Sequence, residues 1–498
     1  MKGVMLQGTA SDVGKSLIAT ALCRLLWKKG FKPAPFKSQN VSNNSYVTAS
    51  GKEIGRAQGL QAEACRLEAI PVMNPILLKP SGSGRSELVL RGERQQTIAG
   101  MAYREHYYET ALQVIEQSLD ELKGLADFLV IEGAGSPVEM NLKKREVVNM
   151  KVAEMADVPV ILIADINRGG LFASVVGTLE LLEPHEKQRV KGLIINKFHG
   201  NPDLFAEGKK WLEERTGLPV LAVLPYLPNH QLEGEDSLSL SARFSSQTQK
   251  ELDIVAIKLP YVSNYSDMEP FLLEEDTSVR WVDSLEAFGE PDAVVLPGTK
   301  STLHDLQFLK ENGLADRIIQ FVQAGGTVAG LCGGYQMLCE QLNDPDGYDA
   351  GVKDYAEAGL GLIPGKTTFF NEKTTVRMQG KVAMLPMIEV NGYEIHIGQT
   401  VIDDSAPFII REDGSEEGYC SKDGHIIGTY MHHVFHNDAW RSEWLNRLRR
   451  KKDLPLRELN IMKEKQQAFD QLADHLEKHL DWVAFTAIID SDEKEKRQ

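Results

Sequence analysis

The feature that most constrains this chain is a glycine-rich loop close to its start. The loop Gly8–Ser16, with the sequence GTASDVGKS, follows a short apolar strand at Val4–Leu6 and precedes a helical pattern at Ser16–Lys29. Backbone N–H groups of such a loop, with a helix N-terminus behind them, bind polyphosphates. A strand, a loop and a helix in this order are typical of a parallel α/β sheet, so the loop indicates both a fold class and a ligand class.

The loop and two later strand ends supply a predicted nucleotide site. The loop has one residue more between its glycines than the common motif, so it is a variant. Lys15 is expected at the outer phosphates, and Ser16 and Glu132 are expected to bind Mg²⁺. The alternatives are a turn with a chance Gly-Lys-Ser and a glutamate that only caps a turn. The residues predicted to bind ATP are Gly8, Thr9, Gly14, Lys15, Ser16, Asn196 and Lys197.

Sequence patterns divide the chain into two α/β halves. Short runs rich in β-branched residues alternate with amphipathic stretches, as in a doubly wound sheet. A polar, serine-rich stretch at 232–250 interrupts this pattern, which restarts at Leu252–Ile257. We therefore predict two doubly wound parallel-sheet domains at 1–231 and 251–445, joined by a linker at 232–250 and followed by a helical tail at 446–498.

A cysteine on a predicted strand-to-helix turn is the sharpest feature of the second half. Glycines surround Cys332 in GTVAGLCGGYQ, as in a nucleophile elbow, and a helix N-terminus favours the thiolate form of a cysteine. The backbone N–H groups of Gly333 and Gly298 are the expected oxyanion donors. His432, in GTYMHHVF, is the expected general base. The alternative is a buried structural cysteine with a histidine that merely belongs to a loop.

Other polar residues are expected at the carboxyl edge of the first sheet, where ligands bind in such folds. They stand in the segments PFKSQN, MNPILLKP and DINRGG. Each alone is more often a solvated loop residue, but all of them are expected at one edge. The residues predicted to contact substrate or the transferring phosphoryl group are Lys37, Gln39, Asn40, Lys79 and Arg168.

Composition excludes several classes of protein. The 55 Lys and Arg against 71 Asp and Glu give a net charge of −16, which argues against an extended nucleic-acid surface. Five cysteines without a C-x-x-C pair argue against a disulfide framework and against structural zinc. No apolar run approaches the roughly 18 residues of a membrane span. We expect a cytoplasmic protein with no bound redox cofactor.

The motifs together resemble those of the cobyric acid synthase family, the glutamine-dependent amidotransferases of cobalamin biosynthesis. The loop GTASDVGKS is similar to that of dethiobiotin-synthetase-like amidoligases. The blocks that resemble the synthase in particular are PFKSQNVSNNS, EIGRAQGLQAEA, MNPILLKP, IEGAGSPVEMNL, ADINRGGLFAS and IINKFHGN. In the second half, LPGTKST, GLCGGYQML, GYEIHIGQT and GTYMHHVF resemble a class I glutaminase domain. The resemblance implies a P-loop NTPase-like first domain and a flavodoxin-like second domain.

The resemblance also implies a reaction. Cys332 would attack the glutamine amide and release ammonia, with His432 shuttling the proton. In the first domain, Mg·ATP would phosphorylate a carboxylate of adenosylcobyrinic acid a,c-diamide, and ammonia would displace the phosphate at the b, d, e and g side chains in turn. Because ATP and this corrinoid polycarboxylate are anionic while the chain is acidic, we predict that Lys15, Lys37, Lys79 and Arg168 gather in a locally positive cleft.

Two residues depart from the pattern of the family. Many class I glutaminases carry a glutamate two residues after the catalytic histidine, where this chain has Val434, so the third member of the triad stays unassigned. His433 stands where glycine is expected.

Three alternatives stay open at this point. The nearest is a cobyrinic acid a,c-diamide synthase with the same chemistry at the a and c carboxylates. A partition-type ATPase would carry a lysine at the position of Ala10 and would not explain Cys332. A binding module with an inactive glutaminase domain is the third. A homo-oligomer is also compatible with the sequence.

Overall fold

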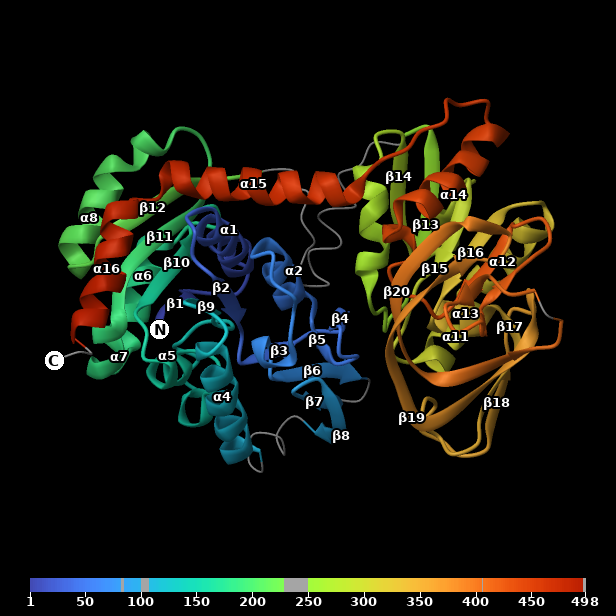
Figure 1. Ribbon diagram of the computed structural model, residues 1–498, viewed down its shortest axis with the longest axis horizontal. Helices are drawn as coiled ribbons and strands as arrows, with labels where there is room; N and C mark the ends of the chain where they lie inside the picture. The colour runs from blue at the N-terminus through green and yellow to red at the C-terminus, as the bar shows by residue number, and fades with distance from the viewer. Residues whose placement is uncertain (82–84, 100–106, 228–249, 405, 496–498) are drawn as a thin grey trace.

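The computed structural model describes residues 1–81, 85–99, 107–227, 250–404 and 406–495, and two α/β bodies lie side by side in it (Figure 1). The predicted linker at 232–250 lies outside the described residues, apart from Lys250. Among the described residues, no helix has both the length and the apolar character that a membrane crossing requires.

The first body is built on a six-stranded parallel sheet. Its strand order is β12-β11-β10-β1-β9-β2, so the chain starts in the middle of the sheet and winds outward in both directions. Successive side chains of β1 enter two different cores, Met5 on one face and Val4 and Leu6 on the other. The strands are β1 (Lys2–Gly8), β2 (Pro33–Phe36), β9 (Phe128–Glu132), β10 (Val160–Asp165), β11 (Val190–Phe198) and β12 (Val220–Pro225).

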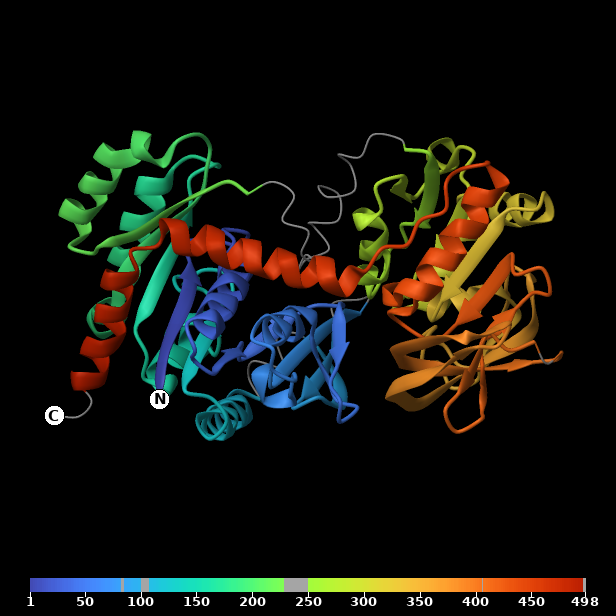
Figure 2. The ribbon, with the colours of Figure 1, turned by 45° about the horizontal axis from the view of Figure 1, so that its top comes forward.

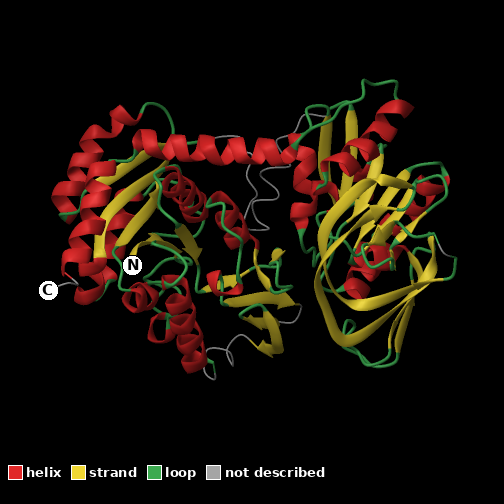
Figure 3. Cartoon of the chain, viewed as in Figure 1, coloured by secondary structure: helices red, strands yellow, loops and turns green. Residues whose placement is uncertain are grey.

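Helices cover both faces of this sheet, which confirms the predicted doubly wound architecture (Figure 3). Residues of α4, α5 and α6 join the core on the Met5 face, whereas α1 packs on the opposite face. The helices are α1 (Lys15–Lys28), α2 (Arg56–Ala64), α4 (Tyr108–Lys123), α5 (Met150–Ala156), α6 (Leu171–Leu181), α7 (Pro184–Arg189) and α8 (Ala206–Thr216), with 3-10 turns η1 (Pro71–Met73), η2 (Lys143–Arg145) and η3 (Pro202–Phe205).

A smaller β region extends the first body toward the second. It consists of a four-stranded sheet in the order β3-β6-β7-β8 and a two-stranded ribbon of β4 and β5. This region carries residues 42–45, with the sequence SNNS, which we call the SNNS segment. It ends beside the second body (Figure 1). Its strands are β3 (Gln39–Val41), β4 (Ser45–Val47), β5 (Glu53–Gly55), β6 (Ile76–Ser81), β7 (Arg85–Leu90) and β8 (Glu93–Ala99).

The second body repeats the α/β plan, as predicted. Its sheet has the order β14-β13-β15-β16-β24-β23, and only β23 runs antiparallel to its neighbour. The strands are β13 (Leu252–Ile257), β14 (Thr277–Val282), β15 (Ala293–Leu296), β16 (Thr327–Leu331), β23 (Tyr419–Cys420) and β24 (Ile426–Thr429). The helical segments are η4 (Tyr265–Leu273), α10 (Leu285–Phe288), α11 (Thr302–Glu311), α12 (Leu314–Gln323), α13 (Gly333–Leu338), η5 (Val434–His436) and α14 (Asp438–Lys451).

A further, mostly antiparallel sheet in the second body was not predicted. Its order is β18-β17-β19-β21-β22, and the long strand β20 pairs with β19. The strands β19 and β20 have many polar, partly exposed positions, so their sequences lack the continuous apolar runs that mark buried parallel strands. The strands are β17 (Cys339–Asp344), β18 (Tyr355–Ala358), β19 (Ile363–Val382), β20 (Leu385–Ile402), β21 (Ile409–Arg411) and β22 (Glu416–Glu417).

The C-terminal helices return to the first body. The expected domain boundary at 445 falls inside α14, and the chain then crosses back through α15 (Ile461–His479) to α16 (Trp482–Glu495) (Figures 1 and 2). Phe469 and Leu472 are buried in the same core as α1. Arg24 of α1 donates to Asp470 at 2.8 Å. The tail therefore completes the core of the N-terminal domain.

Candidate active site

The phosphate loop has the geometry of an anion cradle. Gly14 adopts φ +98° immediately before α1, a conformation that glycine permits without strain. A Cβ on Gly8 would lie 2.7 Å from the carbonyl oxygen of Ala10, so this position also requires glycine. The Thr9 N–H donates to Ile163 at 2.9 Å, which anchors the loop to β10. The Lys15 ammonium donates to Gly135 at 3.2 Å across the loop, which brings it to the end of β9.

The residues predicted to hold Mg²⁺ touch each other. The Ser16 hydroxyl donates to Glu132 Oε1 at 2.7 Å. Lys37 donates to the same oxygen at 2.9 Å, and Gln61 donates to Oε2 at 2.7 Å. Hydroxyl and carboxylate oxygens are the ligand types that Mg²⁺ prefers, and the carboxylate is already buried at the mouth of the phosphate loop. The chemistry of this donor set fits the ion.

Asn196 and Lys197 lie against the back of the phosphate loop. The Asn196 amide donates to Val13 at 2.8 Å, and the Lys197 ammonium donates to the carbonyl of Asp12 and to Asp165. Arg168 pairs with Asp12 at 3.2 Å and is mostly exposed. These residues brace the loop, and the contact of Asn196 and Lys197 with ATP stays a prediction.

The other two residues predicted from the PFKSQN segment, Gln39 and Asn40, contact β6 and α2. Asn40 is buried, and its amide nitrogen lies 3.4 Å from Gln58 Oε1 on α2. Gln39 is partly exposed in β3, where it pairs with Ile76. Contact of either residue with substrate stays a prediction.

The predicted gathering of four cations is wrong at Lys79. Lys15, Lys37 and Arg168 reach the phosphate loop or Glu132, as described above. The Lys79 side chain is only 2% exposed, and its ammonium donates to Ser45 and Glu53 instead. The reason is the hairpin of β6 and β7, which turns Lys79 toward buried carboxylates at the contact with the second body. There Lys373 of β19 bonds both Glu53 and Glu87.

Cys332 occupies the predicted elbow. It follows β16 with φ +51° and immediately precedes α13, in the left-handed region that a non-glycine residue adopts only under local constraint. A Cβ on Gly334 would lie 2.0 Å from the Leu296 carbonyl oxygen, so the turn fits only because this side chain is missing. A Cβ on Gly333 would lie 2.5 Å from Thr299. The elbow thus packs directly against the loop that contains Gly298.

His432 lies between Cys332 and an acid that the sequence did not reveal. Cys332 and His432 are 5% and 1% exposed. The Cys332 thiol donates to the Ile395 carbonyl at 3.4 Å, and its side chain is near enough to His432 to affect the pKa of that histidine. The His432 Nδ1 lies 2.7 Å from Asp267 Oδ2. Burial alone would lower the pKa of His432, but the Asp267 carboxylate and the Cys332 side chain raise it to about 10. A Cβ on Gly298 would lie 2.9 Å from the His432 ring, so the loop that contains Gly298 packs directly against this histidine.

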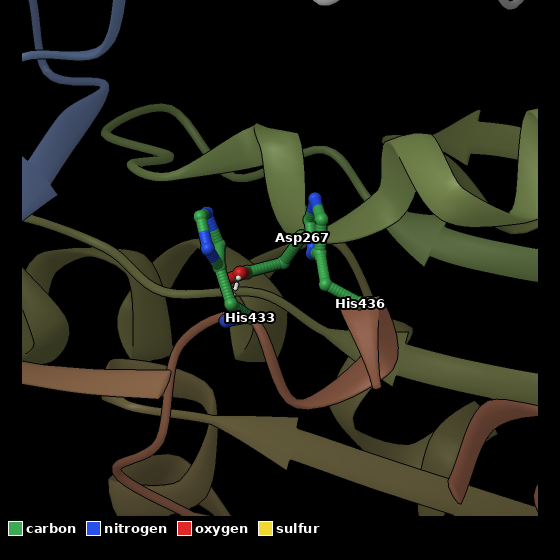
Figure 4. A group of neighbouring side chains, drawn as sticks. All are labelled: Asp267, His433 and His436. Carbon is green, nitrogen blue, oxygen red and sulfur yellow. Dashed lines mark hydrogen bonds between the residues drawn. The ribbon is translucent and has the colours of Figure 1, made fainter. Parts of the chain in front are cut away.

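Asp267 comes from η4, far from His432 in the sequence. Its other oxygen, Oδ1, accepts a hydrogen bond from the His433 backbone N–H at 2.8 Å, and Figure 4 shows the carboxylate reaching toward this backbone. The rings of His433 and His436 stack beside it with centroids 4.1 Å apart. Ligand-type atoms of Asp267, His433 and His436 lie within 4.8 Å of one another. Both carboxylate oxygens thus bond the loop of His432 and His433, called the histidine loop below, and we assign Asp267 to orienting His432.

The comparisons with known proteins match both bodies. A family model described as CobQ/CobB/MinD/ParA nucleotide binding domain matches residues 4–238. A second, described as CobB/CobQ-like glutamine amidotransferase domain, matches residues 253–440. A cobyric acid synthase of Geobacillus sp. (strain WCH70) is 48% identical over 96% of this chain and 95% of its own length. That of Trichormus variabilis is 43% identical over 97% of this chain and 100% of its own.

The chain belongs to the cobyric acid synthase family. This confirms the predicted family and the enzyme class, a glutamine amidotransferase ligase with a nucleotide-binding domain. In this member of the cobyric acid synthase family, Val434 stands two residues after His432, and the acid that contacts the His432 ring is Asp267. No sequence motif marked Asp267, since its partner is 165 residues away.

Proposed function

We propose that Cys332, His432 and Asp267 hydrolyse glutamine. The observation that carries this proposal is the buried chain of contacts from Cys332 through His432 to Asp267. The Cys332 sulfur attacks the amide carbon, His432 delivers a proton to the departing ammonia, and a thioester forms. Water then attacks the thioester with His432 accepting its proton, which releases glutamate and restores the thiol. The N–H groups of Gly333 and Gly298 are the proposed donors to the oxyanion.

The phosphate loop is the proposed site of carboxylate activation. Backbone N–H groups of the loop bind the ATP phosphates, and Lys15 and Lys37 neutralise charge on the transferred phosphoryl group. Ser16 and Glu132 would hold Mg²⁺, which supplies further neutralisation of phosphate charge when bound. A carboxylate is a poor electrophile, and phosphorylation gives it a leaving group. Ammonia then attacks the acyl phosphate, so an amide and inorganic phosphate form.

The proposed substrate is adenosylcobyrinic acid a,c-diamide, amidated at its b, d, e and g carboxylates to adenosylcobyric acid. Support comes from the family to which the chain belongs. The test is mass spectrometry of the diamide incubated with ATP, Mg²⁺ and glutamine, in which four successive OH-to-NH₂ exchanges are expected. Amidation of unamidated cobyrinic acid alone would instead favour an a,c-diamide synthase.

A paired experiment separates the two sites. Cys332→Ser is expected to abolish glutamine-dependent amidation and to leave amidation with ammonium salts intact. Lys15→Ala is expected to abolish amidation from either nitrogen source. Loss of both activities in Cys332→Ser, or of neither, would contradict the two-site scheme, and amidation that persists in Lys15→Ala would contradict the phosphate-loop assignment.

A further inference from the structure

The SNNS segment of the first body bonds the start of η4 in the second body. Two hydrogen bonds join them. The Ser45 backbone N–H donates to Asn264 Oδ1 at 3.0 Å, and the Ser266 hydroxyl donates to Asn44 Oδ1 at 3.0 Å. All four residues are buried. These bonds therefore lie inside the contact between the bodies, where water does not compete for them.

Asn264 and Ser266 belong to the segment that carries Asp267. Asn264 has φ +50° at the start of η4, and its carbonyl accepts from the Asp267 N–H at 3.0 Å. Ser266 immediately precedes Asp267 in the chain. A displacement of Asn264 or Ser266 would therefore move the carboxylate that contacts His432.

A second contact from the SNNS segment reaches His432 through Tyr393. The Tyr393 hydroxyl donates to the Ser45 carbonyl at 3.0 Å. The Tyr393 ring stacks on the His432 ring with centroids 5.4 Å apart, and the His432 N–H donates to the Tyr393 carbonyl at 2.8 Å. Ser45 therefore bonds both Asn264, in the segment of Asp267, and Tyr393, whose ring stacks on His432.

The SNNS segment is itself fixed within the first body. The Asn44 carbonyl accepts from the Arg56 N–H at 3.1 Å, where α2 begins. On the same helix, Gln61 donates to Glu132 at 2.7 Å. The Ser45 hydroxyl lies in the ion-pair cluster of Glu53 and Lys79. One buried network therefore runs from the phosphate loop to the histidine loop.

We propose that Asn44 and Ser45 are positioning residues of the glutaminase. From the opposite domain, they fix the position of Asp267 relative to His432 through their bonds with Asn264, Ser266 and Tyr393. This inference rests on the proposed glutaminase role of Cys332 and His432. It makes glutamine hydrolysis dependent on residues of the domain that consumes the ammonia.

The test uses the full chain with Asn44→Ala, Ser266→Ala and the double variant. Each single change removes one partner of the same hydrogen bond, so each is expected to lower kcat for glutamine hydrolysis about five- to tenfold with KM little changed. The double variant is expected to be no slower than the slower single variant, because both changes remove one shared interaction. The pH dependence of Cys332 alkylation by iodoacetamide is expected to differ from that of the parent in all three variants.

Ammonia-dependent amidation is the check on folding and is expected to stay within about twofold of the parent rate. Arg94→Ala is the matched control, because Arg94 also crosses the contact between the bodies, donating to the Asn371 carbonyl at 3.1 Å, but away from Asp267. A parental kcat and pH profile in Asn44→Ala would overturn the proposal, as would additive losses or an equal loss of ammonia-dependent amidation. If Cys332→Ala still hydrolyses glutamine, the proposed glutaminase site itself is wrong. If Cys332→Ala abolishes glutamine hydrolysis and Asn44→Ala hydrolyses glutamine at the parental rate, only the positioning role is wrong.

Discussion

The Asp267 carboxylate lies 2.7 Å from the His432 ring nitrogen although 165 residues separate them in the chain. Both side chains are buried, so neither can be held by water. The pairing gives this glutaminase an acid from η4 rather than from the residues that follow the histidine.

Replacing Asp267 with asparagine is expected to lower kcat for glutamine hydrolysis by at least about 10²-fold, because the amide cannot stabilise the imidazolium or fix its tautomer. Ammonia-dependent amidation should be unchanged. The comparison variant is Glu269→Gln, a buried acid on the same turn that is not among the residues bonded to His432. A parental rate in Asp267→Asn would remove Asp267 from the triad.

The same change should move the pH dependence of the thiol. In the parent, the pKa of His432 is raised to about 10 by Asp267 and Cys332, so the imidazolium form persists well above neutral pH. Without the carboxylate, the pKa of His432 should fall, and the imidazolium should be lost at lower pH. The test is the rate of Cys332 alkylation by iodoacetamide, measured between pH 6 and about 11. The part of the curve that follows loss of the His432 imidazolium should shift to lower pH. An unchanged pH dependence of the alkylation rate would show that Asp267 does not set the charge of His432.

The ion-pair cluster between the bodies should contribute to stability. Burial alone would raise the pKa of Glu53 and of Glu87, but nearby lysines, including Lys373, hold both pKa values below the usual range. Lys373→Ala removes positive charge beside two buried carboxylates. It is expected to lower the free energy of unfolding, measured in urea, by about 3–5 kcal/mol. Lys52→Ala is the control, because its pair with Glu93 is exposed, and it should cost under about 1 kcal/mol.

This cost should depend on pH in a defined direction. Glu53 and Glu87 have folded pKa values below their unfolded values, so the stability they contribute is present above about pH 4.5 and is lost as the pH falls. The parent and Lys373→Ala should therefore converge in stability toward acid pH. A difference that grows below pH 4 would contradict the assignment of the cluster.

The elbow should not tolerate a methyl group at Gly334. Its Cβ would lie 2.0 Å from a backbone oxygen, which cannot move away as a flexible side chain could. Gly334→Ala is expected to abolish glutamine hydrolysis while the P-loop domain retains ammonia-dependent amidation. Gly177→Ala is the control in α6, where nothing lies within 4 Å of the added Cβ, and it should be neutral or stabilise by about 0.5–1 kcal/mol.

The sequence predicted what depends on local pattern. The strand–loop–helix around Lys15 and the elbow around Cys332 each carry their signal within about a dozen residues, and both parallel sheets follow from short apolar runs. Asp267 and the ion-pair cluster were missed because they depend on which segments meet in space. Lys79 was misplaced for the same reason, since a lysine that follows apolar residues such as those at 76–78 has the same sequence pattern whether it faces a ligand or a buried glutamate.

The crossing of α15 has a consequence for how this protein comes into being. Phe469, Leu472 and Leu476 fill the core above α1, yet they are synthesised after the entire glutaminase domain. The apolar surface of the N-terminal domain around α1 is therefore covered only after α15 has been synthesised. A fragment that stops after the nucleotide-binding half should emerge from the ribosome with that face exposed and should aggregate unless the last helices are supplied in trans.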